Sequence, residues 1–310
     1  MARKRKGLPV HGWLIFDKPA GMTSTSAVGL ARRMFEAQKA GHGGTLDPFA
    51  TGILPIAFGE ATKTVSYVMD GDKEYRFTIK WGTETDSCDP EGKVVAESDV
   101  RPDKAAIEAV LAQFVGSIEQ IPPIYSAIKI DGERAYDLAR AGETPEMKPR
   151  AVEIYELDLV DCPDRDHAVL EAVCGKGTYV RALARDIARA LGTVGHVEQL
   201  RRVAVGPFGE DDAISLDALE DLGNKLPPER QEALFAVEAA LDGIPAVDLT
   251  EAEAMRLRNG QAVSFLRKMD LERIGTLVEG DVVLAMADGR PLALSVFERG
   301  EMRPVRVLNI

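Results

Sequence analysis

The sequence feature that most constrains the fold is the stretch Gly41–Lys63, which reads GHGGTLDPFATGILPIAFGEATK. Its first half combines four glycines with the pair Asp47-Pro48, and such residues favour turns over helix or strand. It continues into Ile53–Phe58, an apolar run with the length of a short buried strand. Since loops on a rigid scaffold often carry functional groups, we expect His42 and Asp47 to project from a braced loop. On composition alone, the simpler interpretation is that Asp47 only begins a turn.

Length and cysteine content limit the classes of protein to which this chain can belong. A chain of 310 residues can bury a full core, and this length predicts two domains. The three cysteines are scattered without CxxC spacing, which favours reduced thiols in a cytoplasmic protein over a disulfide framework. The sequence shows neither a signal-peptide-like apolar segment nor a long apolar span, so we expect neither secretion nor membrane insertion.

Charge is distributed unevenly, and this matters more than the net charge of −12. Residues 210–253 carry 13 acidic side chains against two basic ones, so the rest of the chain is close to neutral. Residues 1–40 carry a net charge of +6. A local basic region of this kind suits phosphate binding. The run Arg3–Lys6 fits a solvated, disordered tail equally well.

Apolar runs and helical spacings predict strands and helices over most of the chain. Strands are expected over Gly12–Pro19, Ile53–Phe58, Tyr75–Trp81, Ala151–Val160 and Val169–Cys174, the last two paired. Helices are expected from a cap at Thr23 or Ser24 to about Phe35, over Asp103–Val115, and over Tyr179–Leu191.

Three segments after residue 120 differ from the rest of the chain in composition and pattern. Ile121–Arg150 is bounded by prolines and contains the hairpin signal Asp131-Gly132, so we interpret it as a candidate mobile insertion. Residues 210–243 are interpreted as an acidic, partly helical connector that faces solvent. Beyond it, Thr250 and Glu253 form a capping box, and Val278–Ile310 alternates around a DGRP turn as a small antiparallel β-domain does. We therefore place one domain at 1–243 and a second at 244–310.

The helix Tyr179–Leu191 carries arginines at positions 181, 185 and 189, beside its apolar stripe. Arginines spaced in this way commonly form a solvated helix face. Arg181, however, lies in the first turn, where the helix dipole disfavours a cation. We therefore expect Arg181 to have a carboxylate or phosphate partner elsewhere in the fold.

Motifs for the common cofactor chemistries are absent from the sequence. The four histidines are not paired with cysteines at metal-ligand spacing, and GKGT at 175–178 lacks the upstream glycine and the ending of a P-loop. Neither GxGxxG nor GxSxG occurs. We therefore expect no metal and no cofactor. A carboxylate, a tyrosine and an arginine remain as parts for covalent or acid–base catalysis.

Longer motifs carry a resemblance to a known family. The stretch GHGGTLDPFATGILPIAFGEATK resembles the catalytic motif of the bacterial tRNA pseudouridine-55 synthases, the TruB family. The resemblance continues in FDKPAGMTS, DKEYRF, GTETDSCDPEG, IPPIYSAIK, GKGTYVRALARDI and HVEQLRRVAVGPF, in matching order and spacing over about residues 10–210. Several long motifs in register are far more specific than one short motif. Gly43 stands where the family commonly has Thr, and the C-terminal third matches only loosely.

The resemblance implies an α+β fold: a mixed, mostly antiparallel central sheet flanked by helices, followed by a small PUA-like β-domain. It implies site-specific isomerisation of uridine to pseudouridine at position 55 of tRNA, in the T arm. The base would be flipped out of its stack, detached at C1′–N1 and rejoined at C1′–C5. It also implies tRNA, through its T stem-loop, as the partner of a monomer that has no obligate protein partner.

Roles carry over residue by residue. Asp47 matches the nucleophile, which could attack C1′ as in a retaining glycosidase; addition at C6 and a glycal path stay open. Arg181 would pair with Asp47, keep it ionised and lower its pKa. Tyr75 would stack on the extruded uracil and assist proton transfer.

The remaining carried-over residues surround the base or the RNA backbone. His42 would occupy the space that the flipped base vacates, and Tyr179 and Leu200 would line the pocket. Lys18, Lys63 and Lys129 are candidate contacts to the RNA backbone. Each of these residues also has an ordinary structural interpretation, as core or as solvated surface.

Two rival functions come from other classes. An RNA-binding module without catalysis is disfavoured by the presence of Asp47, Tyr75 and Arg181. A glycosidase-like hydrolase that uses Asp47 needs a second carboxylate as its acid, and the motif offers none nearby.

Overall fold

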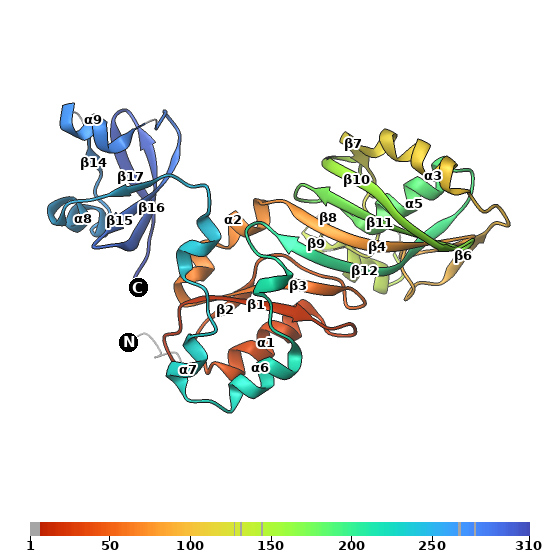
Figure 1. Cartoon of the computed structure of the whole chain (residues 1–310), viewed down its shortest axis with the longest axis horizontal. Helices are drawn as coiled ribbons and strands as arrows, with labels where there is room; N and C mark the ends of the chain where they lie inside the picture. The colour runs from red at the N-terminus through yellow and green to blue at the C-terminus, as the bar shows by residue number, and fades with distance from the viewer. Residues whose placement is uncertain (1–6, 127, 131, 144, 266–267, 276) are drawn as a thin grey trace.

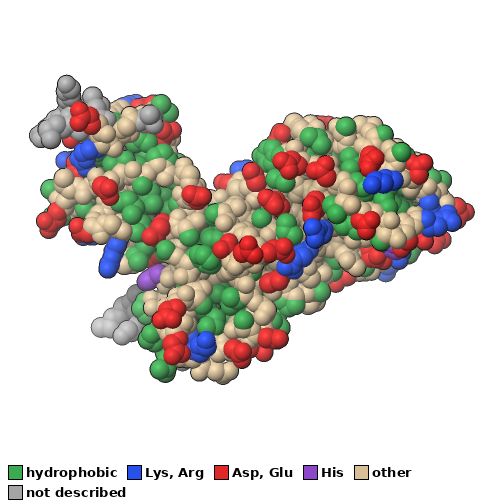
Figure 2. All heavy atoms as spheres, in the orientation of Figure 1, with side chains coloured by type: hydrophobic (Ala, Val, Ile, Leu, Met, Phe, Trp, Pro, Cys, Tyr) green, Lys and Arg blue, Asp and Glu red, His purple; other side chains and the backbone are tan. Residues whose placement is uncertain are grey.

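The computed structural model describes residues 7–126, 128–130, 132–143, 145–265, 268–275 and 277–310. The basic run Arg3–Lys6 and the turn residue Asp131 therefore lie outside the described residues. The chain forms a larger body built on one sheet and a smaller β-domain at the C-terminal end (Figure 1). In the space-filling view, a notch separates the two above α2 (Figure 2).

The larger body is built on an eight-stranded sheet in the order β1-β3-β12-β4-β11-β10-β7, with β2 beside β3. Neighbouring strands run antiparallel except β3 and β12, which are parallel. The predicted mixed, mostly antiparallel sheet is confirmed. Its strands are β1 (Gly12–Lys18), β2 (Ala40–His42), β3 (Thr51–Phe58), β4 (Lys73–Trp81), β7 (Gly116–Gln120), β10 (Arg150–Asp164), β11 (His167–Cys174) and β12 (Gly195–Val205).

Burial along the strands explains which part of the sheet is rigid. In β1 and β3 almost every residue is buried, so both faces of this part of the sheet are covered. In β11, buried and half-buried residues alternate, as in a strand whose second face is partly open. The loop that leads into β3 is therefore attached to the most deeply covered part of the sheet.

The predicted helices are confirmed with small changes at their ends. Helix α1 (Ser24–Met34) is capped by Thr23, whose side chain accepts from the Ser26 N–H. Helix α3 (Lys104–Leu111) ends in the 3₁₀ turn η2 (Ala112–Phe114), which the apolar spacing alone did not distinguish from α-helix. Of the other helical elements, η1 (Gly59–Lys63) and α2 (Val65–Asp70) follow β3, and α5 (Val180–Ala190) connects β11 to β12.

The sequence analysis predicted no strand at β12, yet β12 lies in the middle of the sheet between β3 and β4. Its adjacent arginines, Arg201 and Arg202, break the apolar pattern by which a central strand is found. Arg202 is nevertheless buried, with an exposed fraction of 2%. The strand was missed because the backbone carbonyls that accept hydrogen bonds from the Arg202 guanidinium are distant in sequence.

The segment 121–150 contains a hairpin and a short helix. Strands β8 (Lys129–Ile130) and β9 (Glu133–Arg134) pair antiparallel, which confirms the predicted hairpin, and α4 (Ala135–Arg140) follows. Mobility of this segment stays a prediction. A second two-stranded ribbon, β5 (Thr83–Thr85) with β6 (Val94–Glu97), extends from the end of β4.

The acidic stretch packs more closely than predicted. It contains η3 (Glu210–Asp212), α6 (Leu216–Gly223), α7 (Pro227–Gln231) and η4 (Val237–Leu241). Acidic side chains gather over α6 and α7 on the visible face (Figure 2), but Leu219 and Leu222 are buried in the main core. The interpretation of this stretch as a solvent-facing connector is therefore wrong for its apolar side, which helps close the larger body.

The C-terminal β-domain has a five-stranded sheet in the order β13-β15-β16-β17-β14. The antiparallel run around the DGRP turn and the capping box of Thr250 and Glu253 are both confirmed. Its elements are β13 (Ala246–Asp248), α8 (Glu251–Arg258), β14 (Val263–Ser264), α9 (Lys268–Ile274), β15 (Val282–Ala287), β16 (Arg290–Glu298) and β17 (Glu301–Val307). The division of the chain at 243/244 stays a prediction.

The end of the chain returns to the larger body. Leu308 is buried in the same cluster as Trp13 of β1. Lys63 Nζ donates to the Val307 carbonyl at 2.7 Å, and the Asn309 N–H donates to Glu60 Oε2 at 2.8 Å. The three cysteines are free thiols. Within the described ranges, no helix combines the length and the apolar character needed to cross a membrane.

Candidate active site

The loop from His42 to Thr51 is held at several points. Ser24, the first residue of α1, both donates to the Leu46 carbonyl at 3.0 Å and accepts from the Leu46 N–H at 2.8 Å. The Gly21 N–H donates to the Pro48 carbonyl at 2.8 Å. Leu46 itself is buried. The predicted braced loop is confirmed, and Asp47 stands between two anchored residues.

Asp47 forms an ion pair with Arg181, the first-turn arginine of α5. Arg181 Nη2 donates to Asp47 Oδ1 at 3.1 Å, and Nε lies 2.9 Å from Oδ2 without forming a hydrogen bond, so both carboxylate oxygens are within ion-pair distance. The Arg181 side chain is 4% exposed, whereas the Asp47 side chain is 33% exposed. The carboxylate is thus aimed by a buried group while it keeps one side accessible.

Arg181 has a second carboxylate partner that the sequence analysis missed. Its Nη1 donates to Asp89 Oδ2 at 3.1 Å and to the Ser87 carbonyl at 3.0 Å, and Nη2 donates to the Tyr125 carbonyl at 2.9 Å. The expectation of a carboxylate partner for Arg181 is confirmed, and the solvated-face interpretation is wrong for this residue. Asp89 lay within a quoted motif, but its spacing from Arg181 gave no signal.

The electrostatics of Asp47 differ from the expectation. Burial raises the pKa of the Asp47 carboxyl above its ordinary value, and Arg181 opposes this rise. Asp89 raises the pKa further, whereas Lys18 lowers it. The guanidinium lowers the pKa of Asp47 as predicted, but desolvation exceeds this effect, so the pKa as a whole is raised.

Two tyrosines lie within electrostatic reach of Asp47. Tyr75 is on β4 and Tyr179 caps the N-terminus of α5; both are half-buried. Burial is the main cause that raises the pKa of each phenol, and the Asp47 carboxylate raises both further. Leu200 is buried on β12, in the apolar cluster against which Tyr75 packs. The structure therefore brings Tyr75 and Tyr179 within electrostatic reach of Asp47, and places Leu200 in the apolar cluster against which Tyr75 packs.

His42 ends β2, at the start of the loop. Its Nδ1 is buried and has no hydrogen-bond partner in the described part of the chain. Burial and the nearby Arg202 guanidinium lower the pKa of the imidazole, so the ring is held neutral. A neutral ring whose buried nitrogen has no hydrogen-bond partner there suits contact with an apolar or aromatic surface.

The three predicted lysine contacts differ in their surroundings. Lys18 is buried, and its Nζ donates to the carbonyls of Pro19, Met22 and Pro48 at 2.9, 2.9 and 3.2 Å. Burial lowers its pKa to about 8. The prediction that Lys18 contacts the RNA backbone is therefore wrong: it ties the turn after β1 to the loop.

Lys63 and Lys129 remain nearer the surface. Lys63 lies 2.6 Å from Glu60 Oε2 and also donates to the Val307 carbonyl, so its ammonium is engaged within the protein. Lys129 is exposed on β8. Of the three lysines, only Lys129 has the exposure that an external phosphate requires.

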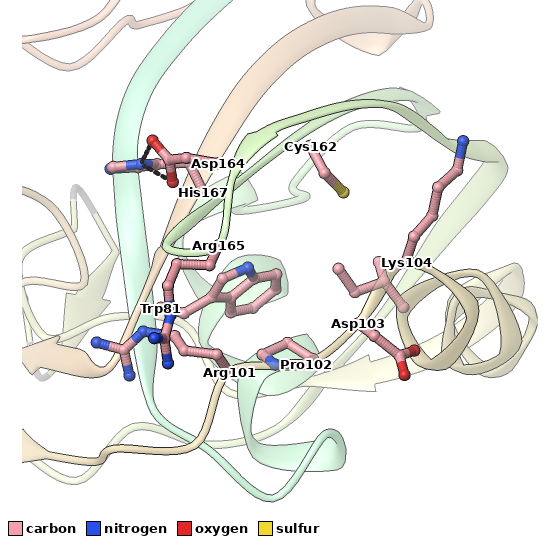
Figure 3. A pocket seen from close by; sticks show the side chains of 10 residues that line it. Trp81, Arg101, Pro102, Asp103, Lys104, Cys162, Asp164, Arg165 and His167 are labelled. Carbon is pink, nitrogen blue, oxygen red and sulfur yellow. Dashed lines mark hydrogen bonds and ion pairs between the residues drawn. The ribbon is translucent and has the colours of Figure 1, made fainter.

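The pocket in Figure 3 lies away from these residues. Its volume is about 350 Å³, and Trp81, Arg101, Lys104 and Arg165 are among the residues that line it. Trp81 ends β4 six residues beyond Tyr75, a distance of about 20 Å along a strand. Arg101 is already paired with Asp166 at 2.5 Å. Across the described residues, no group of three or more His, Cys, Asp or Glu side chains is placed to hold a metal ion.

Known proteins match this chain over its whole length. Residues 32–180 match the TruB family pseudouridylate synthase N-terminal domain, and residues 181–242 match the tRNA pseudouridylate synthase B C-terminal domain. A curated tRNA pseudouridine synthase B from Rhodospirillum rubrum is 54% identical over 310 residues, which span 100% of both chains. The chain belongs to the TruB family of pseudouridylate synthases. It is therefore an enzyme of the isomerase class.

A second curated relative has the same name, and two solved structures share the fold of this chain. A tRNA pseudouridine synthase B from Bradyrhizobium diazoefficiens is 57% identical, covering 99% of this chain and 88% of that protein. A chain of an H/ACA RNP bound to a substrate RNA containing 2′-deoxyuridine matches with a TM-score of 0.74 at 22% identity, over 100% of this chain and 92% of that one. A chain of a Cbf5-Nop10-Gar1 complex gives 0.73 at 24% identity, over 100% and 90%. These likenesses show the pseudouridine synthase fold.

Proposed function

We propose that this TruB-family enzyme isomerises uridine 55 in the T arm of tRNA to pseudouridine, with Asp47 as the nucleophile. The observation that carries the proposal is the pairing of both Asp47 oxygens with a nearly buried Arg181, while the carboxylate stays partly exposed beside two tyrosines. Relatives more than half identical over the whole chain are named tRNA pseudouridine synthase B, which supports tRNA as the substrate.

The chemistry requires one nucleophile and a pocket that retains the base. When Asp47 attacks C1′, the C1′–N1 bond breaks and uracil leaves with its electron pair. The base then turns, C5 bonds to C1′, and the carboxylate leaves; the proton on C5 is lost and N1 gains one. Addition of Asp47 at C6 and a glycal path reach the same product. All three routes need an ionised and aimed carboxylate, which the Arg181 pair supplies.

Retention of the base is the role of the residues around Asp47. A uridine inside a folded arm exposes C1′ and C5 together only after it is flipped out, which costs a few kcal/mol. Tyr75 stacks on the extruded uracil and Tyr179 and Leu200 close the pocket around it. His42, whose pKa is lowered by burial and whose Nδ1 has no hydrogen-bond partner among the described residues, enters the space left in the RNA. The Tyr75 phenol assists transfer of the C5 proton.

Part of the RNA-binding surface lies outside the pocket around Asp47. Lys129 is exposed on the β8–β9 hairpin and contacts the backbone, and the C-terminal β-domain extends the binding surface. The enzyme acts as a monomer in the cytoplasm, consistent with its free thiols.

The test uses the protein with a T-arm RNA that carries tritium at C5 of uridine 55. Isomerisation must release this label into water, because C5 becomes the carbon bonded to C1′. A binding module would leave the label in the RNA, and a hydrolase would release labelled free uracil. A matched RNA labelled only at another uridine is the control, and label release from that RNA would contradict the assigned position.

A further inference from the structure

Arg202 is a large, fully buried charged side chain to which the proposed mechanism gives no role. It lies on β12 with an exposed fraction of 2% and is among the largest fully buried side chains. Burying a guanidinium costs several kcal/mol unless its donors are satisfied. The partners of Arg202 therefore show what its burial achieves.

The guanidinium donates to three backbone carbonyls, two in the loop before Asp47 and one in β3 after it, and it also interacts with the Tyr75 side chain. Nε donates to the Ile53 carbonyl at 2.8 Å, Nη1 to the Thr45 carbonyl at 3.3 Å and Nη2 to the Gly44 carbonyl at 3.1 Å. Within the described ranges, no carboxylate forms an ion pair with Arg202. Gly44 and Thr45 precede Asp47 and Ile53 follows it, so one planar group spans both ends of the loop.

The backbone of Arg202 holds the same loop from a second direction. β12 and β3 are parallel, and Arg202 pairs with Gly52. Gly52 has φ +100°, and a Cβ there would lie 2.2 Å from the Arg202 carbonyl oxygen. Because only glycine fits this approach, strand and loop are in direct backbone contact. Backbone and side chain of one residue thus determine where the loop leaves β2 and where it enters β3.

Arg202 also faces the strand that carries Tyr75. On β4, its register partner is Tyr75 itself. The guanidinium lowers the pKa of the Tyr75 phenol against the effect of burial, and it contributes to the lowered pKa of His42. Arg202 therefore lies between the loop that holds Asp47 and two other residues of the candidate site.

We propose that Arg202 is a positioning residue that fixes the Asp47 loop against Tyr75, through its three carbonyl bonds and its contact with β4. This inference rests on the function proposed above. Lysine cannot replace it, because the three carbonyls are bonded by three separate nitrogens of the planar guanidinium, whereas an ammonium donates from a single nitrogen. A misplacement of about 1 Å between reacting groups can lower a rate by about 10²-fold.

The test compares R202K with R201K, a matched change at the neighbouring residue. The Arg201 side chain pairs with Asp17 and Glu210, and among the described residues it donates to no carbonyl of the loop. Single-turnover release of tritium from the T-arm RNA is measured at saturating RNA, well below each variant's melting temperature. We expect R202K to lose about 10²-fold in rate with RNA affinity within about threefold, and R201K to stay near the wild type.

Two further variants separate positioning from simple support of the fold. R202Q keeps planar donors but no charge, and R202M keeps neither. A positioning role predicts the rate order wild type, then R202K or R202Q, then R202M, among proteins that remain folded. R202K or R202Q folded and within about threefold of the wild-type rate would overturn the inference. So would a rate loss that higher RNA concentration restores. A wild-type protein that releases no label would instead overturn the proposed function.

Discussion

The larger body and the C-terminal β-domain differ in what they bury. Among the described residues, the larger body buries charged side chains, including Lys18, Asp89, Arg181, Arg185 and Arg202, whereas residues 246–310 bury one polar side chain, Ser295. The C-terminal core is otherwise apolar. Since burying a charged side chain costs free energy, the concentration of buried charges in the larger body indicates that these groups are positioned for chemistry.

The role of the buried charges is tested most strongly by substituting one buried and one exposed arginine on the same helix. Arg181 bridges Asp47 and Asp89 with its planar fork, whereas Arg189 is 56% exposed and pairs with Glu84. Arg181→Lys should lower the single-turnover rate by about 10²-fold or more, because lysine cannot hold two carboxylates and two carbonyls. Arg189→Lys should change the rate by less than about threefold. Equal losses in both variants would contradict the special role of the buried pair.

In the apolar core of the C-terminal β-domain, a substitution should lower the stability of the protein and leave the rate of isomerisation unchanged. Leu294 on β16 is 1% exposed and packs with Leu284 and Leu241. Leu294→Ala should lower the free energy of unfolding by about 2–5 kcal/mol, as measured by urea denaturation. At saturating RNA and low temperature, the rate should stay near the wild type. A folded variant with a strongly reduced rate there would show that the C-terminal core also positions the site.

The pH dependence of the rate should report the burial of Asp47. Its pKa is raised, chiefly by burial, and only the ionised form can act as nucleophile. As pH falls through this raised pKa, the rate should fall by about tenfold per pH unit, beginning above the range of an ordinary aspartate. The sign for stability is opposite: a raised folded-state pKa favours folding at low pH, and that contribution is lost as pH rises through it. An acid limb at or below the ordinary range would contradict the burial argument.

The smallest expected effect concerns the contact between the two parts of the molecule. The Lys63 ammonium bridges Glu60 and the Val307 carbonyl while remaining partly exposed. Lys63→Met should lower the free energy of unfolding by no more than about 1 kcal/mol. It should leave the salt dependence of RNA binding unchanged if the contact is internal. A slope of log affinity against log salt reduced by about one unit would show that Lys63 binds phosphate instead.

Sequence reasoning found the elements whose signals are local. The cap at Thr23, the buried strands β1 and β3, and the capping box at Thr250 each follow from neighbouring residues. The long family motifs located Asp47 and Arg181, and the dipole argument required a partner for Arg181 before the fold was known.

What escaped sequence reasoning depends on groups distant in the chain. Asp89 meets Arg181 across 92 positions, and Arg202 meets Ile53 across 149, so neither contact leaves a periodic signal. Lys18 was taken for a surface group because lysines usually are, yet three carbonyls satisfy it in the interior. The acidic stretch was misjudged because its charges concealed the leucines of α6.

The most direct measurement is tritium release by Asp47→Asn on the C5-labelled T-arm RNA. Asparagine keeps the shape of the side chain but cannot act as a nucleophile, and Arg181 keeps its bonds to Asp89 and to two carbonyls. We expect the variant to fold with a melting temperature no lower than the wild type and to bind RNA normally. Its release of label should fall by about 10⁴-fold or more. Release close to the wild-type rate would contradict the assignment of Asp47 as the nucleophile.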